Sequence, residues 1–148
     1  MTTMIENHRA SFDYEILEKF QAGLELTGQE VKSLRMKRGS LEGARVIVRG
    51  GEAYIINMEI PPYQPGNLPE KGYDDRRTRR ILLTKAEIEK IEGLGSKNGL
   101  TIIPISVYNV GRYLKVTVAI VRGKKKFDKR ESIKKRETDR EIRRTLKS

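Results

Sequence analysis

The chain has 148 residues, no cysteine and a net charge of +11 with a pI near 9.9. This length fits one domain with a modest core, and the lack of cysteine excludes disulfides and thiolate metal sites. The excess of Lys and Arg favours a polyanionic partner, nucleic acid before an anionic membrane surface. No apolar run approaches the length of a spanning helix, and the stretch MTTMIENHRASF lacks a signal-peptide pattern, so we expect a cytoplasmic protein.

The first third of the chain predicts a strand followed by a helix. Residues 13–26 mix β-favouring and polar side chains and fit a long strand bent at Gly23. Thr27 followed by Glu30 is a capping-box signature. A short helix therefore begins at Thr27, and Gly39 marks its end.

The middle of the chain predicts a hairpin and a long loop. Residues 44–60 contain two β-rich runs on either side of Gly50-Gly51, a pair that suits a tight turn. Residues 61–77 contain four of the five prolines, a density that strands do not tolerate. We expect a loop there and renewed strand character over residues 79–85.

The remaining core elements are a second helix and a second hairpin. Thr84 and Glu87 form another capping box, and Gly93 closes the helix that follows. Residues 100–108 and 112–121 pair around Asn109-Val110-Gly111, with Pro104 at a strand edge or a bulge. In the last strand four apolar side chains share one face: Leu114, Val116, Val118 and Ile120.

Together these elements predict a mainly β protein, a small antiparallel OB-fold-like β-barrel with two or three short helices. Residues 123–148 hold 12 Lys and Arg against 5 Asp and Glu, whereas the preceding residues hold 19 against 15. This charge step predicts a barrel domain over residues 1–122 and a basic C-terminal tail over 123–148. The tail lacks a continuous apolar stripe, so we expect it to be disordered when free and helical against a polyanion.

The sequence offers little enzymatic chemistry. His8 is the single histidine and lies in a polar N-terminal arm, so neither a histidine-based nucleophile nor the usual zinc site is supported. Phosphate-binding glycine motifs do not occur, and the acidic residues are interleaved with basic ones as on a solvated surface. We expect no enzyme activity, no metal and no cofactor.

Four basic clusters dominate instead, and aromatic residues lie near them. Cations neutralise phosphates, and flat rings stack on unpaired bases; the residues themselves therefore predict a protein that binds RNA or single-stranded nucleic acid. The clusters are Lys32-Arg35-Lys37-Arg38, Arg76-Arg77-Arg79-Arg80, Lys115 with Arg112 and Arg122, and the tail, and the aromatic residues are Tyr63, Tyr73, Tyr113 and Phe127.

Longer strings of residues resemble the SsrA-binding protein family, also called small protein B. The similarity covers nearly the whole chain in the right order, and the pairing of EVKSLR with GKKxxDKR is specific. The strings are N-x-R-A at 7–10, F-x-A-G-L-x-L-x-G-x-E-V-K-S-L-R at 20–35, Pro62-Tyr63, R-x-R-x-x-L-L at 77–83, L-T-I-I-P-I-S-V-Y at 100–108 and G-K-K-x-x-D-K-R at 123–130.

The resemblance implies an RNA-binding adaptor of trans-translation. Such a protein binds the tRNA-like domain of transfer-messenger RNA and brings it to ribosomes stalled on messages without a stop codon. Its barrel takes the place of an anticodon arm, and its tail enters the empty message channel near the decoding centre. Elongation factor Tu and alanyl-tRNA synthetase are indirect partners through the charged RNA. We expect a monomer with no membrane partner.

The resemblance also implies two sets of site residues. The residues that contact transfer-messenger RNA would be Asn7, Arg9, Gln21, Leu82, Lys115, Arg122, Lys124 and Lys125. The residues that act in the decoding centre would be Phe127, Asp128, Lys129 and Arg130, followed by a helical stripe of Arg136, Arg140 and Arg144.

Three positions depart from the family pattern. Gln21 stands where Glu is common and loses a charge-assisted acceptor, Asp75 replaces a loop proline, and Phe127 replaces His or Tyr. Other functions that the residues leave open are a small RNA-modifying or RNA-cleaving barrel, a structural ribosomal protein with a threading tail and, least favoured, a membrane-surface protein.

Overall fold

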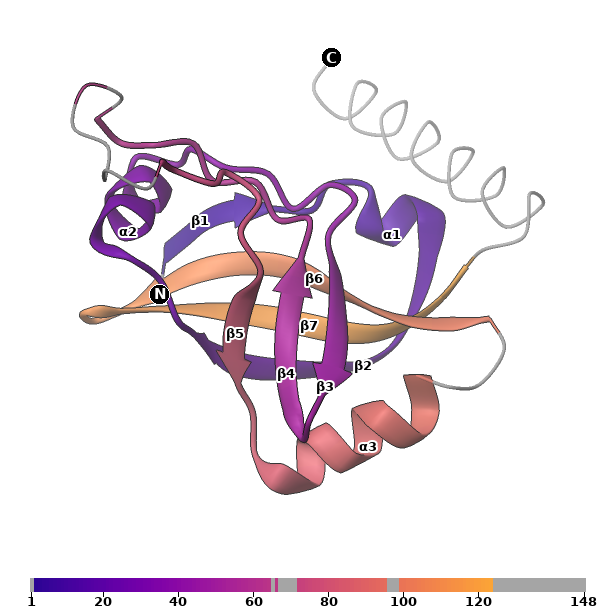
Figure 1. Cartoon of the computed structure of the whole chain (residues 1–148). Helices are drawn as coiled ribbons and strands as arrows, with labels where there is room; N and C mark the ends of the chain where they lie inside the picture. The colour runs from indigo at the N-terminus through magenta and orange to yellow at the C-terminus, as the bar shows by residue number, and fades with distance from the viewer. Residues whose placement is uncertain (1, 65, 67–71, 96–98, 124–148) are drawn as a thin grey trace, which may run out of the picture.

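The computed structural model describes residues 2–64, 66, 72–95 and 99–123, which form seven strands and three helices (Figure 1). The strands are β1 (Thr2–Glu6), β2 (Tyr14–Leu24), β3 (Arg45–Arg49), β4 (Glu52–Ile56), β5 (Arg79–Leu82), β6 (Leu100–Val110) and β7 (Tyr113–Gly123). The helices are α1 (Ala10–Asp13), α2 (Gly28–Arg35) and α3 (Lys85–Gly95).

The strands form one antiparallel sheet in the order β1-β6-β7-β2-β5-β4-β3. The sheet is strongly curled, because β3 at one end packs against β6 near the other. Figure 1 shows β3, β4 and β5 crossing the longer strands β2, β6 and β7, with α3 across one end. The predicted mainly β, OB-fold-like antiparallel barrel is confirmed.

The barrel interior is lined by one face of each strand. Leu114, Val116, Val118 and Ile120 of β7 are all buried in the main core, as their alternation predicts. A second, smaller cluster lies on the opposite face of the sheet, where Ala10 of α1 packs with residues of β6 and β7. Its buried members are Ala10, Ile103, Ala119 and Val121.

Both capping boxes are confirmed. In α2 the Thr27 hydroxyl accepts a hydrogen bond from the Glu30 N–H at 3.3 Å, and the Glu30 carboxylate accepts one from the Thr27 N–H at 2.8 Å. Thr84 and Glu87 make the equivalent pair before α3. The helix ends differ from the prediction: α2 is regular to Arg35, and α3 continues past Gly93 to Gly95, because one glycine inside a helix costs only about 1 kcal/mol.

Three further features differ from the sequence-based picture or refine it. Strand β1 and helix α1 were not predicted, since the N-terminal stretch appears polar until β6 supplies its partner. The β6–β7 turn is Gly111-Arg112, because Val110 pairs with Tyr113. Pro104 lies at a register shift in β6, the bulge that its missing N–H favours.

Within the part of the chain described, no helix is long and apolar enough to cross a membrane.

Candidate nucleic-acid interface

The side of the sheet opposite the barrel interior presents a polar surface, which we call the outer face. Lys115 and Thr117 of β7 lie on it, because they alternate with the buried core residues of the same strand. Further along β7, Ala119 and Val121 are on the same face but are buried in a cluster with Ala10 of α1. The open part of the outer face therefore lies between α1 and the β6–β7 turn.

Three predicted RNA-contacting residues meet on or beside this open part. Gln21 of β2 is exposed and pairs with Thr117, and Gly23 pairs with both Lys115 of β7 and Leu82 of β5. Gly23 is the point where β2 passes from one neighbour to the other. Gln21, Leu82 and Lys115, which come from three strands, thus lie within two adjacent cross-strand rows.

Gly23 also brings the Leu82 side chain close to the sheet. A Cβ atom at position 23 would lie 3.3 Å from both the Cβ and the Cδ1 of Leu82. Leu82 is nevertheless 49 % exposed, so it offers an apolar contact beside the Lys115 cation. A side chain at position 23 would displace Leu82 by a few tenths of an ångström, so the glycine allows this close approach.

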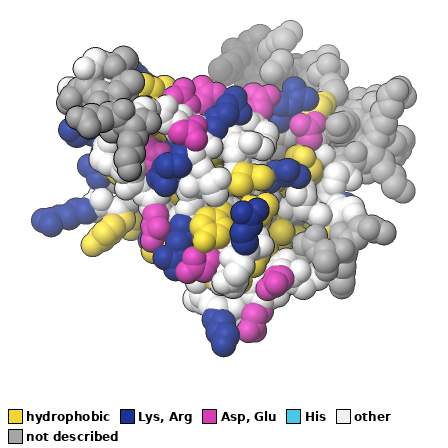
Figure 2. All heavy atoms as spheres, viewed as in Figure 1, with side chains coloured by type: hydrophobic (Ala, Val, Ile, Leu, Met, Phe, Trp, Pro, Cys, Tyr) yellow, Lys and Arg dark blue, Asp and Glu magenta, His cyan; other side chains and the backbone are white. Residues whose placement is uncertain are grey.

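A groove of about 260 Å³ opens next to these residues. Its walls come from the end of β2, from β5, from α2 and from the start of β7, and they combine apolar and cationic side chains. The lining residues used below are Leu82, Val31, Arg112, Tyr113 and Lys115. Tyr113 is 74 % exposed, and Figure 2 shows basic and hydrophobic side chains together at the left edge, where Figure 1 places the β6–β7 turn.

Tyr113 and Arg112 were absent from the predicted site residues. Tyr113 was recognised as an aromatic near a basic cluster, and its place on the face opposite Leu114 follows from strand alternation. Its high exposure depends on the position of the turn, which the sequence predicts at residues 109–111 but which lies at Gly111-Arg112. A flat exposed ring beside two cations is suited to stack on an unpaired base.

Asn7 and Arg9 lie elsewhere, around a larger cavity of about 470 Å³. The Asn7 side-chain amide donates to the Pro104 carbonyl at 3.2 Å and to the Leu41 carbonyl at 3.5 Å. It therefore fastens the chain after β1 across the β6 bulge.

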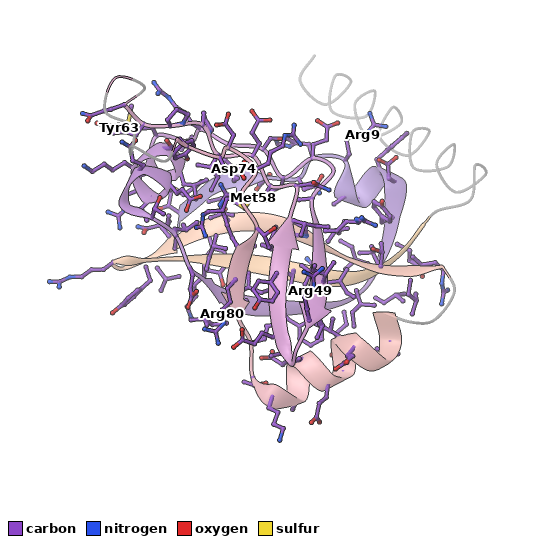
Figure 3. All side chains as sticks on the ribbon, in the orientation of Figure 1. Arg9, Arg49, Met58, Tyr63, Asp74 and Arg80 are labelled. Atoms are coloured by element: carbon purple, nitrogen blue, oxygen red, sulfur yellow. The ribbon has the colours of Figure 1, made fainter. Side chains whose placement is uncertain are left out.

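Arg9 is paired with Asp13 at 3.2 Å and lies over the Phe12 ring. Hydrogen bonding to Asp13 raises the pKa of Arg9 above its ordinary value. Figure 3 shows Arg9 beside α1, at the side away from Tyr63 and α2. The structure does not bring Arg9 together with the residues at the groove.

Arg122 is also separate from Lys115. Seven residues along β7 correspond to about 23 Å, and Arg122 alternates onto the other face of the strand. Its guanidinium lies 3.9 Å from the Glu15 carboxylate. The predicted cluster of Lys115, Arg112 and Arg122 is thus wrong as a cluster: Arg112 and Lys115 line the groove, and Arg122 lies at the opposite end of the strand.

The arginines of the predicted basic cluster at 76–80 are paired within the protein, and one of them, Arg79, is not accessible to a ligand. Arg79 is fully buried, with its Nε 2.6 Å from the Glu30 Oε2 and its Nη1 donating to the Met58 carbonyl at 2.6 Å. Arg77 binds the other oxygen of Glu30 at 2.6 Å. Arg76 pairs with Glu59, and Arg80 with Glu25 and Glu52.

Glu30 is the centre of this network and is also buried. Burial by itself would raise the pKa of its carboxyl group, but hydrogen bonds from Arg77, from the Thr27 N–H and from Arg79 outweigh it. The pKa of Glu30 is therefore lower than its ordinary value. The network ties α2 to β5 and to the base of the long loop, whose Asp75 carbonyl accepts from Ile60 N at 2.9 Å and from Arg79 at 3.1 Å.

The cluster on α2 remains exposed, with Lys32, Arg35, Lys37 and Arg38 all at the surface. Lys32 lies over the Tyr63 ring, 5.7 Å from its centroid, and Figure 3 shows Tyr63 beside α2. Gln29 accepts hydrogen bonds from the N–H groups of Tyr63 and Gln64. The helix therefore anchors the start of the 61–77 loop as well as its end.

Several predictions fall outside the described residues. They concern the tail and the two lysines before it: Lys124, Lys125, Phe127, Asp128, Lys129, Arg130, Arg136, Arg140 and Arg144. His8 is exposed near Glu6, as expected for a surface residue. Among residues 2–64, 66, 72–95 and 99–123, no three acidic or histidine side chains are grouped so as to hold a metal ion.

Comparisons with known proteins agree with one another. A model of the SmpB protein family matches residues 4–148. An SsrA-binding protein of Thermosipho africanus is 45% identical over 148 residues, covering 99% of this chain and 98% of the relative. One from Gloeothece citriformis is 42% identical over 142 residues, covering 96% and 91%.

A solved structure gives the same result. One chain from a structure described as "tmRNA-SmpB: a journey to the center of the bacterial ribosome" matches with a TM-score of 0.70 and 39% sequence identity. The match covers 87% of this chain and 93% of the other. At this level of identity and coverage, the similarity extends over the barrel as a whole.

Proposed function

The chain belongs to the SmpB protein family, and on this premise we propose that it binds transfer-messenger RNA and delivers it to stalled ribosomes. The observation that supports the proposal best is the convergence of Gln21, Leu82 and Lys115 beside one groove. Lys115 and Arg112 would neutralise phosphates, and Leu82 and Tyr113 would contact bases. The SsrA-binding relatives and the tmRNA-SmpB structure support this RNA as the ligand.

The protein acts in this proposal as an adaptor rather than as an enzyme. The ribosome, elongation factor Tu and alanyl-tRNA synthetase supply the chemistry, and the chain needs no cofactor. It works in the cytoplasm as a monomer. Its 1–122 domain takes the place of an anticodon arm, and its 123–148 tail occupies the message channel near the decoding centre. Lys124 and Lys125 would extend the RNA contacts, and residues 127–130 would act in decoding.

A binding preference tests the proposal. The affinity of the full chain for a tRNA-like domain is compared with its affinity for an unrelated structured RNA of equal length, at the same physiological salt concentration. Phosphate contacts alone would bind both RNAs equally. Contacts to the bases and shape of the tRNA-like domain should therefore give a clear preference for it. Equal affinities, or a preference for ribosomal RNA, would favour a structural ribosomal protein instead.

A truncation separates the two proposed functions of the chain. A variant that ends at Lys126 is expected to bind the tRNA-like domain nearly as the full chain does but to fail in tagging peptides on stalled ribosomes. Tagging by the truncated chain at the full rate would show that residues 127–148 serve only solubility. Binding of the RNA is measured in parallel, so that loss of tagging is not mistaken for loss of RNA.

A further inference from the structure

The β6–β7 turn extends beyond its neighbouring strands. On one side, β2 pairs with β7 as far as Lys115, and on the other Thr2 of β1 pairs with Asn109 of β6. Residues 110–113, which we call the hairpin tip, lie past both pairings. A ribbon of two strands by itself is marginally stable in water, so the direction of the tip needs further support.

Part of that support comes from within the hairpin. Gly111 has a φ of +58°, which a glycine adopts without strain. With the Asn109 amide turned so that its nitrogen faces the turn, the orientation that satisfies its surroundings, that nitrogen donates to the carbonyls of Gly111 at 3.2 Å and Tyr113 at 3.3 Å. These bonds shape the turn, but they do not fix its direction relative to the barrel.

Helix α2 supplies a contact from outside the hairpin. Arg35, the last residue of the helix, donates from its Nη2 to the Arg112 carbonyl at 3.0 Å. Val31, one helical turn earlier on the same face, lines the groove together with Arg112 and Tyr113. The side of α2 that carries Val31 and Arg35 therefore faces the hairpin tip.

The helix is a firm support for this contact. Leu34, next to Arg35, is fully buried in the core, and Ser33 is buried and donates to the Pro61 carbonyl at 2.6 Å. Glu30 is held by the two arginines of the buried network. Because the helix is fixed in the core, the Arg35 guanidinium that extends from it can fix the position of the Arg112 backbone.

We propose that Arg35 is a positioning residue, whose hydrogen bond to the Arg112 carbonyl holds the hairpin tip in the orientation that presents Arg112, Tyr113 and Lys115 to RNA. The proposal rests on the proposed function for the ligand, but the tether itself exists without RNA. Lysine at position 35 keeps the charge, yet it lacks the long planar fork of arginine. Positioning therefore depends on the length and geometry of the guanidinium side chain and not on its positive charge alone.

Amide hydrogen exchange of the free protein tests the tether directly. Arg35→Lys and Arg35→Met are each expected to speed exchange at the hairpin tip about five- to tenfold, through local opening, and to leave the β2–β7 amides unchanged. Arg38→Met is the matched control, since it removes the same charge from the same exposed segment. Wild-type exchange at the tip of Arg35→Met would overturn the proposal.

Binding to a tRNA-like domain gives the second readout. Positioning predicts that Arg35→Lys and Arg35→Met weaken binding alike, about three- to tenfold, and that this loss shrinks in a Tyr113→Ala background. A direct phosphate contact predicts an additive loss, rescue by Arg35→Lys and a salt slope lower by about 0.9; that result would overturn positioning. If the wild type shows no RNA preference, the proposed function fails, and the exchange measurement still decides the tether.

Discussion

Two arginine- and lysine-rich stretches of this protein, residues 76–80 and residues 112–115, have opposite roles in the fold. In the first, Arg79 is fully buried and both Arg77 and Arg79 pair with Glu30. These ion pairs hold α2 to β5. In the second, Arg112 and Lys115 line an open groove beside an exposed tyrosine. Figure 2 shows acidic side chains interspersed with basic ones on the face that it presents.

The role of an Arg or Lys side chain here depends on whether a carboxylate pairs with it. For Arg77 and Arg79 that carboxylate is distant in the sequence. Glu30 lies 47 residues from Arg77 and 49 from Arg79. A buried ion that loses its partner is strongly destabilising, whereas an exposed ion pair contributes little. Substitutions in the two stretches should therefore separate stability from RNA binding.

The largest effect is expected from Glu30→Ala, which leaves Arg79 buried without its counter-charge. We expect a loss of about 3–5 kcal/mol in the free energy of unfolding, measured by urea denaturation. Glu25→Ala is the matched control, because it removes the same charge from an exposed pair with Arg80. Equal stability of the two variants would contradict a structural role for the network.

A smaller effect of the same network is expected on acidification. The pKa of Glu30 is lowered in the folded protein from its ordinary value of 4.5, so its stabilisation is complete above that value and is lost as the pH falls below it. The free energy of unfolding should decline less steeply with falling pH in Glu30→Gln, which has no carboxyl group to protonate. Urea midpoints between about pH 7 and pH 3 measure the difference, and parallel curves would refute it.

Lys115→Glu tests the exposed stretch. We expect about a tenfold loss of affinity for the tRNA-like domain, or about 1.4 kcal/mol, because the substitution reverses the charge beside the groove. Unfolding should change little, since Lys115 is on the outer face. Unchanged affinity at physiological salt would remove Lys115 from the interface. Lys85→Glu, at the exposed start of α3, is the control for net charge.

The smallest effect is expected from Arg80→Met, which lies in the same run as Arg79 but is 41 % exposed at its side chain. Loss of its pairs with Glu25 and Glu52 should cost under about 1 kcal/mol. Figure 3 shows Arg80 at the outside of β5. A cost as large as that of Glu30→Ala would mean that exposure does not separate the members of this run.

Local patterns predicted the elements whose signals lie within a few residues. The capping boxes at Thr27 and Thr84, the bulge at Pro104 and the buried face of β7 were all correct. Strand β1 was missed, because an edge strand with polar side chains is defined by its partner β6. The place of the turn was off by about one residue, since the pairing register is set by the whole hairpin.

For the candidate site, the sequence by itself determined the mainly β fold, the excess of positive charge and the family, whose motifs led to Gln21, Leu82 and Lys115. The tertiary structure decided which cations are available. It buried Arg79, turned Asn7 toward backbone carbonyls, separated Arg122 from Lys115 and placed Arg112 and Tyr113 at the groove. The physical reason is that the packing of strands and helices far apart in the chain decides whether a charged side chain is paired with an opposite charge or exposed to solvent.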